Sequence, residues 1–391
     1  MKNICLYFQV HQPYRLHEIS FFDLGYSKPY FNDELNKGIL KKVADKSYLP
    51  TIALFHKILA QNPSFQFSLS FSGVVLEQFE ESQPEVLEAF KGLIATGNVE
   101  VLGETYYHSL SAFYDKKDFI YQVKKHSEKV KELFGVVPRT FRNTELSYQN
   151  NILKLLKDEF QFDTILTEGV SWSLKGENVN QVFTGNDGET KILLRNNKLS
   201  DDIAFRFSDE QSDVYPLMVN KFLDFVSQEE GELVNLFMDF ETIGEHHDST
   251  TGIFDFFEKL LLAPNINFVF PNAIAKEMDA KFTYSVQFPI SWADEGKDLS
   301  AWTGNSLQKE AISKVYNIRS EVYKTNSTEL IAIWEKLTTS DHFYYMSTKN
   351  SNDGVVHRYF NPYGSPYNAY IYYMNVVSDL KIRLAKKLKK Q

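Results

Sequence analysis

Cysteine is almost absent from this chain, and so are long apolar runs. Cys5 is the only cysteine, which rules out an internal disulfide and a cysteine-based zinc cluster. No stretch of the sequence reaches the roughly 18 apolar residues that span a membrane. The first residues, MKNICLYFQVHQP, lack the apolar core and the small-residue cleavage site of a secretory signal. We therefore expect a cytoplasmic protein.

An excess of basic charge and the common nucleotide-binding motifs are missing too. The formal net charge is −9, which disfavours nucleic acid as a partner because binding it usually requires a basic surface. Neither G-x-G-x-x-G nor G-x-x-x-x-G-K-[ST] occurs, so the main reasons to expect a nucleotide-binding sheet are absent. Aromatic residues, in contrast, make up 15% of the 391 residues, and exposed rings are good platforms for flat ligands such as sugars. A neutral carbohydrate remains open as the ligand.

Short runs rich in β-branched and aromatic residues alternate with segments of helical spacing. We predict strands at 4–11, 65–72, 99–108, 139–145, 162–169, 191–196 and 232–241, with a weaker eighth at 267–273. Predicted helices lie between them at 48–61, 84–96, 117–134, 149–160, 214–229 and 252–262. This alternation indicates a parallel sheet covered by helices. From about residue 285 the pattern becomes mostly helical, with helices at 326–338 and 366–388.

Most of the predicted strands end in polar or ionisable residues. They are His11, Glu104 with His108, Glu145, Glu168, and Asp239 with Glu241. In a parallel βα barrel the C-terminal ends of the strands share one face, and that face carries the active site. A doubly wound sheet also gathers ligands at strand ends. The pattern therefore favours a barrel without excluding the sheet.

Two of these acids have contrasting surroundings. Glu145 follows Arg142, which would stabilise its anion and make it a possible nucleophile, although an acid before a helix can also be a simple cap. Asp239 follows the apolar run LVNLFM, so burial should raise its pKa and suit it as a general acid; a buried salt bridge is the alternative. Retaining hydrolysis of a glycosidic bond needs one ionised and one protonated carboxyl group about 5–5.5 Å apart.

A metal-dependent hydrolase is a second interpretation of the same residues. Metal-ligand residue types are present at His11, His108, Glu145, Asp239, Glu241, His246 and His247. However, the sequence has no H-E-x-x-H motif, and adjacent histidines point in different directions on most backbones. The spacing argues weakly against a metal site.

Five motifs occur in a fixed order: HQPYRL, GNVEVLGETYYHSL, FRNTELSY, FMDFETIGEH and ISWADEGKDLSAWTGN. Together they resemble the five sequence regions of glycoside hydrolase family 57, with the closest similarity to its α-amylase branch, over nearly the whole chain. The resemblance implies an α/β fold: an incomplete, TIM-like (β/α)7 barrel, here residues 1–285, followed by a mostly helical domain, here residues 286–391, that contributes to the cleft. It implies no metal and no cofactor.

The resemblance also assigns roles to residues. It implies that Glu145 is the catalytic nucleophile and Asp239 the general acid/base. Residues expected to contact the sugar are His11, Glu100, Glu104, His108, Arg142, Glu241, His246, Trp292, Asp294, Asp298 and Trp302. Several also have a structural interpretation: Glu100 and Glu104 as a polar strand face, His108 and His246 as satisfied loop residues, and Trp292 and Trp302 as a seal at the domain junction.

The expected function is retaining hydrolysis of α-1,4 bonds in glycogen, starch or maltodextrin. A 4-α-glucanotransferase or a glycogen-branching enzyme would use the same covalent intermediate, and acceptor choice depends on cleft shape and closure. A carbohydrate-binding protein with an idle carboxylate pair and a metal-dependent, deacetylase-like hydrolase are the remaining hypotheses. The sequence leaves the oligomeric state open.

Overall fold

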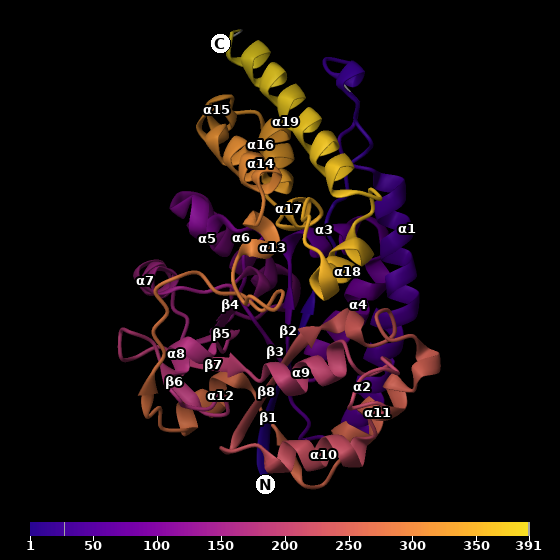
Figure 1. The fold of residues 1–391 in the computed structure, drawn as a ribbon, viewed down its shortest axis with the longest axis vertical. Helices are drawn as coiled ribbons and strands as arrows, with labels where there is room; N and C mark the ends of the chain where they lie inside the picture. Colours follow the sequence, from indigo (N-terminus) through magenta and orange to yellow (C-terminus); the bar gives the residue numbers. More distant parts are fainter. Residues whose placement is uncertain (27, 390–391) are drawn as a thin grey trace.

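The computed structural model describes residues 1–26 and 28–389, and Figure 1 shows its strands gathered towards the end that carries the N-terminus. The strands in this part of the chain are β1 (Lys2–Val10), β2 (Phe67–Phe71), β3 (Val99–Val101), β4 (Thr140–Arg142), β5 (Thr164–Glu168), β6 (Val182–Thr184), β7 (Lys191–Arg195), β8 (Leu233–Asp239), β9 (Ile266–Phe268) and β10 (Phe282–Thr283). The helices up to residue 277 are α1 (Asp33–Val43), α2 (Leu49–Gln61), α3 (Gly73–Ser82), α4 (Pro84–Ile94), α5 (Ser111–Tyr114), α6 (Lys116–Phe134), α7 (Asn150–Glu159), α8 (Ser171–Leu174), α9 (Asn197–Ala204), α10 (Val219–Gln228), α11 (Ile253–Leu261) and α12 (Pro271–Glu277).

Seven strands form a ring in the order β1, β2, β3, β4, β5, β7 and β8. Parallel ladders join β3, β2, β1 and β8, and other parallel ladders join β4, β5 and β7. The two sets meet at Gly103, whose N–H donates to the Thr140 carbonyl at 2.9 Å, and at Asn196, whose N–H donates to the Asn235 carbonyl at 2.9 Å. Isolated contacts replace full ladders at both junctions, so the barrel is incomplete. The predicted (β/α)7-type barrel is confirmed.

The side chains of β1 alternate between two apolar layers. Cys5 and Tyr7 belong to the cluster that fills the barrel interior. Leu6 and Phe8 belong to the larger cluster that packs the strands against the surrounding helices. Because the strand is buried on both faces, its sequence is almost continuously apolar. The next inward position after Tyr7 is Gln9, and it reaches the C-terminal mouth of the barrel.

The seven main strand predictions all correspond to barrel strands, but some limits differ. The strand predicted at 99–108 ends at Val101, because Gly103 bridges to β4. At the weaker eighth strand, predicted at 267–273, the structure has only the short strand β9. It pairs with the first residues of β1 and lies outside the ring. The pattern predicts neither β6 nor β10, since strands of three and two residues are too short to show alternation.

Most predicted helices are also present. The helix predicted at 214–229 starts only at Val219, because Pro216 disfavours helical geometry at the residue before it. Helices α1, α3, α9 and α12 occur in addition to the predicted ones.

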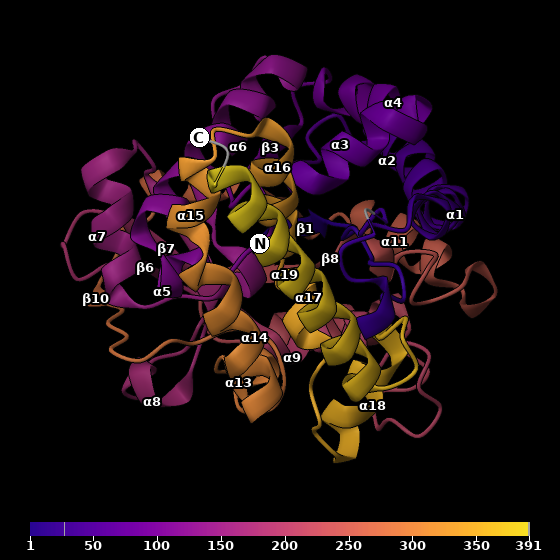
Figure 2. The same cartoon turned by 90° about the horizontal axis from the view of Figure 1, so that it is seen from above.

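Beyond residue 299 the described chain is almost entirely helical. Its helices are α13 (Ser300–Thr303), α14 (Ser306–Asn317), α15 (Arg319–Lys324), α16 (Thr328–Leu337), α17 (Asp341–Tyr344), α18 (Ser351–Phe360) and α19 (Pro366–Leu388). They lie over the end of the barrel opposite the N-terminus (Figures 1 and 2). Their apolar cluster takes in Leu16, Ile19 and Tyr30 from the N-terminal region. Among the described helices, none combines the length and the apolar character needed to cross a membrane.

Candidate active site

A cavity of about 850 Å³ lies where the barrel strands end and the C-terminal helices begin. Three strands contribute their last residue to its lining: Arg142 ends β4, Arg195 ends β7 and Asp239 ends β8. The helical part contributes Asp341 of α17 and Phe360 of α18. The cavity is therefore built jointly by the barrel and by the helices above it, as ligand sites at the C-terminal face of barrels usually are.

Glu145 enters this cavity from a tight turn directly after β4. The turn, Thr144–Leu146, holds Glu145 at φ +60° and Leu146 at φ +49°. Non-glycine residues rarely adopt this left-handed conformation, and such strain concentrates at functional sites. The Glu145 carbonyl also accepts a hydrogen bond from the Trp292 N–H at 3.2 Å. The backbone therefore fixes the direction in which the Glu145 carboxylate points.

Both carboxylate oxygens of Glu145 accept hydrogen bonds. His108 Nε2 lies 2.9 Å from Oε1, and Trp292 Nε1 donates to Oε2 at 2.6 Å. Burial alone would raise the pKa of Glu145, but the hydrogen bond and the charge of His108, together with Arg142 and the indole, bring the pKa below its usual value. Burial likewise opposes a charge on His108, but Glu104 and Glu145 raise its pKa to about 9. Glu145 is thus an anion beside an imidazolium at neutral pH.

Two guanidinium groups contact the ring of Trp292. The Arg142 guanidinium lies 5.3 Å and the Arg195 guanidinium 5.4 Å from the ring centroid. Cation–π contacts of this kind gain strength when they are desolvated, and both arginines are almost completely buried. Lys297 also donates to the Trp292 carbonyl at 3.0 Å. The indole N–H is therefore oriented towards Glu145 before any ligand arrives.

Asp239 has the opposite electrostatic setting. Within the described part of the chain its carboxyl group has no hydrogen-bond partner, and it lies opposite Gln9 in the ladder between β8 and β1. Burial, followed by the negative charge of Glu145, raises the pKa of Asp239 to about 7, even though Arg142 and other cations oppose the shift. The influence of Glu145 shows that the two acids face the same space. One acid is held ionised and the other protonated at or below neutral pH.

Three of the predicted sugar contacts do not line the cavity. Glu104 lies fully buried beneath it, where Gln9 and Arg142 approach its carboxylate at 3.3 Å. Glu100 accepts from the Thr140 hydroxyl and from the Asn272 N–H at 3.2 Å, lower in the barrel. The carboxylate of Asp298 accepts from the Ser300 N–H at 2.8 Å at the start of α13. These acids support the framework around the cavity.

The other predicted contacts do line it. They are His11, His108, Arg142, Glu241, His246, Trp292, Asp294 and Trp302. Glu241 accepts from the Tyr48 hydroxyl at 2.5 Å, and burial, with a contribution from Asp239, raises its pKa to about 8. Burial lowers the pKa of His246 to about 4, which keeps its imidazole neutral. Eight of the eleven predicted sugar contacts therefore line the cavity.

Asp294 is tied to the helical part of the chain. Lys349 Nζ donates to it at 2.6 Å and His357 Nε2 lies 3.1 Å away. Asp294 adopts φ +59° in the loop that also carries Trp292. Contacts from α18 and from the residue Lys349 before it therefore hold the loop that carries Trp292 in place.

Sequence reasoning misses several lining residues, of which Arg195 and Asp341 are the most prominent. Arg195 ends β7, inside the strand predicted at 191–196, so the same strand-end pattern that points to Asp239 also applies to it. Asp341 carries no comparable signal, because it belongs to a helix far along the chain. Its carboxylate lies 3.0 Å from His11 Nε2, and His11 Nδ1 lies 2.6 Å from the Ser72 hydroxyl.

One cluster in the cavity has ligand types that suit a metal ion. Atoms of His11, His108 and Asp341 all lie within 4.8 Å of one another. However, the two imidazole rings are stacked, with centroids 3.9 Å apart and an interplanar angle of 21°. Zinc requires ring nitrogens whose lone pairs converge on one point about 2.0–2.1 Å away, and parallel rings aim their lone pairs side by side. The arrangement does not fit a metal centre.

Comparisons with known proteins agree with this geometry. The family model described as glycosyl hydrolase family 57 matches residues 5–286. A Methanocaldococcus jannaschii protein that bears the name "Putative alpha-amylase" is 38% identical over 400 residues, which cover 98% of this chain and 85% of that protein.

Solved structures share the fold at low identity. The GH57-type branching enzyme of Pyrococcus horikoshii matches with a TM-score of 0.67 and 14% identity, covering 92% of this chain and 87% of the enzyme. The 4-alpha-glucanotransferase of Thermococcus litoralis matches with a TM-score of 0.64 and 16% identity, covering 88% of this chain. This chain spans only 56% of that longer enzyme. Identities this low show the fold and leave the reaction open.

Proposed function

This chain belongs to glycosyl hydrolase family 57, and we propose that it is an α-amylase that hydrolyses α-1,4-glucosidic bonds of glycogen, starch or maltodextrin with net retention. One arrangement carries the proposal: Glu145 and Asp239 line a single cavity, and their surroundings lower the pKa of Glu145 and raise the pKa of Asp239 to about 7. Retaining glycosidases need this pair of protonation states.

We also propose that residues 286–391 form a second domain that completes the cleft. We further propose that the reaction takes place in the cytoplasm, where the unpaired Cys5 would stay reduced.

In this mechanism Glu145 attacks the anomeric carbon while Asp239 donates its proton to the departing glycosidic oxygen. The glycosidic bond breaks and a covalent glycosyl ester forms on Glu145. Asp239, now ionised, then takes a proton from water as the water attacks the same carbon and releases the sugar. The hydrogen bonds from His108 and Trp292 stabilise the carboxylate each time Glu145 is free. Two inversions at one carbon give net retention.

Hydrolysis is our preferred outcome because the relative that covers 98% of this chain bears an amylase name. Transfer to a second sugar is the alternative, since the two structural relatives are a branching enzyme and a glucanotransferase. Both reactions share the covalent intermediate and differ only in the acceptor. Incubation with maltoheptaose, followed by mass and linkage analysis, separates them. Longer or branched products would overturn hydrolysis as the main activity.

The catalytic pair is tested by reducing-sugar release from soluble glucan. Wild type is compared with the variants Glu145→Gln and Asp239→Asn, both of which should lose at least about 10³-fold in rate, because each removes an essential group. Proton NMR of the first products should show the α-anomer. If Glu145→Gln leaves turnover and glucan affinity unchanged, the pair is idle and the protein is a carbohydrate-binding protein.

A further inference from the structure

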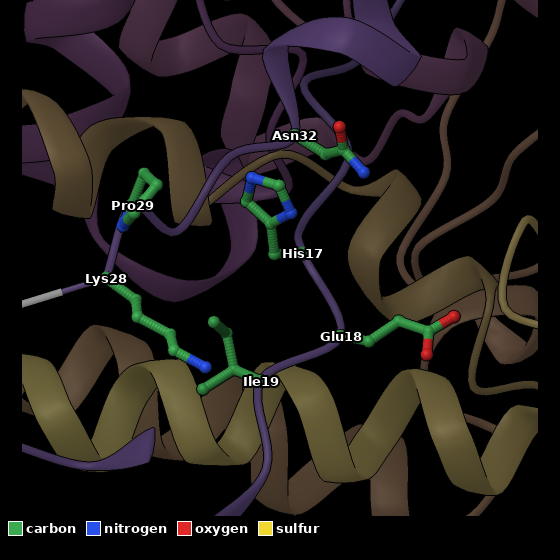
Figure 3. A pocket seen from close by; sticks show the side chains of 6 residues that line it. All are labelled: His17, Glu18, Ile19, Lys28, Pro29 and Asn32. Carbon is green, nitrogen blue, oxygen red and sulfur yellow. The ribbon is translucent and has the colours of Figure 1, made fainter. Parts of the chain in front are cut away.

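A small pocket lies outside the catalytic cavity, beside α19. It has a volume of about 330 Å³ and is lined by His17, Glu18, Ile19, Lys28, Pro29 and Asn32. Figure 3 shows the His17 imidazole and the Asn32 amide near one edge of it, with Lys28 reaching towards Ile19. In the part of the chain that the structure describes, neither the His17 ring nor the Asn32 amide nitrogen makes a hydrogen bond. The Asn32 amide oxygen caps α1 by accepting from the Leu35 N–H at 3.1 Å, so the His17 ring and the Asn32 amide nitrogen are the groups that can bind a ligand.

Three exposed aromatic residues lie in the segment between Ile19 and Lys28, which both line this pocket. Phe21, Phe22 and Tyr26 are 71%, 85% and 76% exposed. The turn that carries the two phenylalanines is ordered by Asp23, whose carboxylate accepts from the Ser20 N–H at 2.9 Å and from its hydroxyl at 2.8 Å. We call Phe21, Phe22 and Tyr26 the aromatic tip. Exposed aromatic rings on a fixed turn, close together in sequence, mark an interaction site.

The aromatic tip is connected to the pocket and held against α19. Lys28, which lines the pocket, pairs with Asp23 of the tip's turn. The Asn375 amide donates to the Ile19 carbonyl at 2.8 Å, and the Gly25 N–H donates to Asp379 at 2.5 Å. The rings and the pocket are therefore presented together as one surface.

This surface is linked to the catalytic cavity along the chain and through packed side chains. Gln12, Pro13 and Arg15 line the cavity, and the pocket starts two residues later at His17. A second connection runs through three tyrosine rings. Tyr363 contacts Tyr345 on one side and Tyr372 on the other. Tyr345 lines the cavity, and burial together with the nearby Glu18 carboxylate of the pocket raises the pKa of Tyr372.

We propose that the pocket and the aromatic tip form a second, non-catalytic binding site for α-glucan chains. Aromatic rings pack against the apolar faces of sugar rings, and the His17 ring and the Asn32 amide nitrogen can bond sugar hydroxyls. The pocket contributes one acid and one base, Glu18 and Lys28, which suits a neutral polymer. The proposal rests on the proposed function, because it takes the same class of substrate. A polymer held here has a high effective concentration at the cavity.

The experiment uses the full chain with two variants. One replaces the aromatic tip, as Phe21→Ala with Phe22→Ala and Tyr26→Ala, and the other is His17→Ala. Glycogen affinity is measured by affinity electrophoresis in a Glu145→Gln background, where the polymer is not consumed. Both variants should bind glycogen roughly tenfold more weakly, since one of two linked contacts is lost. In otherwise active enzyme, kcat/KM should fall for glycogen and stay within about twofold for maltotetraose.

Phe288→Ala is the matched control, because Phe288 is 73% exposed and lines neither cavity. Unchanged glycogen affinity in either test variant would overturn the proposal. So would a change of molar mass in light scattering with glycogen affinity intact, which would make the tip a contact between copies of this chain. A wild-type protein that binds glycogen through the tip but hydrolyses no glucan would instead refute the proposed function and leave this site standing.

Discussion

The indole nitrogen of Trp292 lies 2.6 Å from Oε2 of Glu145 and donates a hydrogen bond to it. The two residues come from opposite parts of the architecture, one from the turn after β4 and the other from the loop that leads to the C-terminal helices. Because Arg142 and Arg195 both contact the indole ring, the donor needs no reorganisation when a ligand binds. A preorganised donor of this kind stabilises charge more effectively than water does.

Trp292→Phe should therefore slow the reaction and shift its pH dependence. A hydrogen bond to a charged group is worth about 1.5–3 kcal/mol, which corresponds to roughly a 10- to 100-fold loss in kcat. Loss of the donor also raises the pKa of Glu145, so the acidic limb of the pH–rate profile should move to higher pH. Steady-state kinetics on maltoheptaose between pH 4 and pH 8 measure both effects.

Trp172→Phe provides the control for that experiment. Trp172 is 57% exposed and does not line the cavity, so its replacement should leave kcat and the acidic limb in place. An acidic limb that stays unchanged in Trp292→Phe would show that the indole does not tune Glu145.

The alkaline limb of the profile should report on Asp239. The proposed mechanism needs Asp239 protonated, and burial together with the charge of Glu145 raises the pKa of Asp239 to about 7. Activity should therefore fall as the pH rises through about 7, since the proton is then lost from the free enzyme. In Glu145→Gln the neighbouring negative charge is gone, so the pKa of Asp239 should decrease towards its usual value while burial keeps it partly raised.

Carbon-13 NMR of labelled aspartate can follow this titration directly in wild type and in Glu145→Gln. The Asp239→Asn variant identifies the resonance. An equal or higher pKa for Asp239 in Glu145→Gln would mean that the two carboxylates are not electrostatically coupled, and the assignment of the pair would fail.

The barrel could be predicted from sequence because its strands carry their own pattern. β1 and β8 are buried on both faces, so their sequences are almost continuously apolar. Polar residues follow where each strand reaches the cavity. Glu145 and Asp239 follow from that strand-end rule together with the motif order. The rule also applies to Arg195, which closes β7 in the same way.

Long-range contacts were beyond the reach of such patterns. Asp341 lies on α17, a four-residue helix, and its proximity to His11 depends on how the C-terminal helices dock on the barrel. The roles of Glu100 and Asp298 illustrate the reverse case. Both stand in motifs of the family, yet their carboxylates bond neighbouring backbone N–H groups outside the cavity. A motif in the sequence identifies which residue stands at a position, but it does not show whether the side chain of that residue points into the cavity.

Barrel closure at Gly103 can be tested by adding one methyl group. A Cβ at this position would meet the Phe162 ring at 2.7 Å, at the junction where β3 meets β4. Gly103→Ala should therefore destabilise the fold by about 1–3 kcal/mol through overpacking. Gly38→Ala is the control, because a Cβ added to Gly38 in α1 would meet no atom within 4 Å, and alanine should stabilise that helix by about 0.5–1 kcal/mol. Urea unfolding measures both, and an unaffected Gly103→Ala would argue against a tight junction.

Asp341→Asn should weaken substrate binding with little effect on the chemical step. The Asp341 carboxylate lines the cavity and bonds His11 at 3.0 Å, so it can accept hydrogen bonds from sugar hydroxyls in the bound state. Loss of its charge should raise KM for maltoheptaose about tenfold, because bonds to charged groups are worth about 1.5–3 kcal/mol, and kcat should change less. Asp298→Asn is the contrasting variant: its carboxylate accepts from the Ser300 N–H outside the cavity, and the amide oxygen of asparagine can accept the same bond. A larger KM increase for Asp298→Asn than for Asp341→Asn would reverse the roles that the geometry gives these two acids.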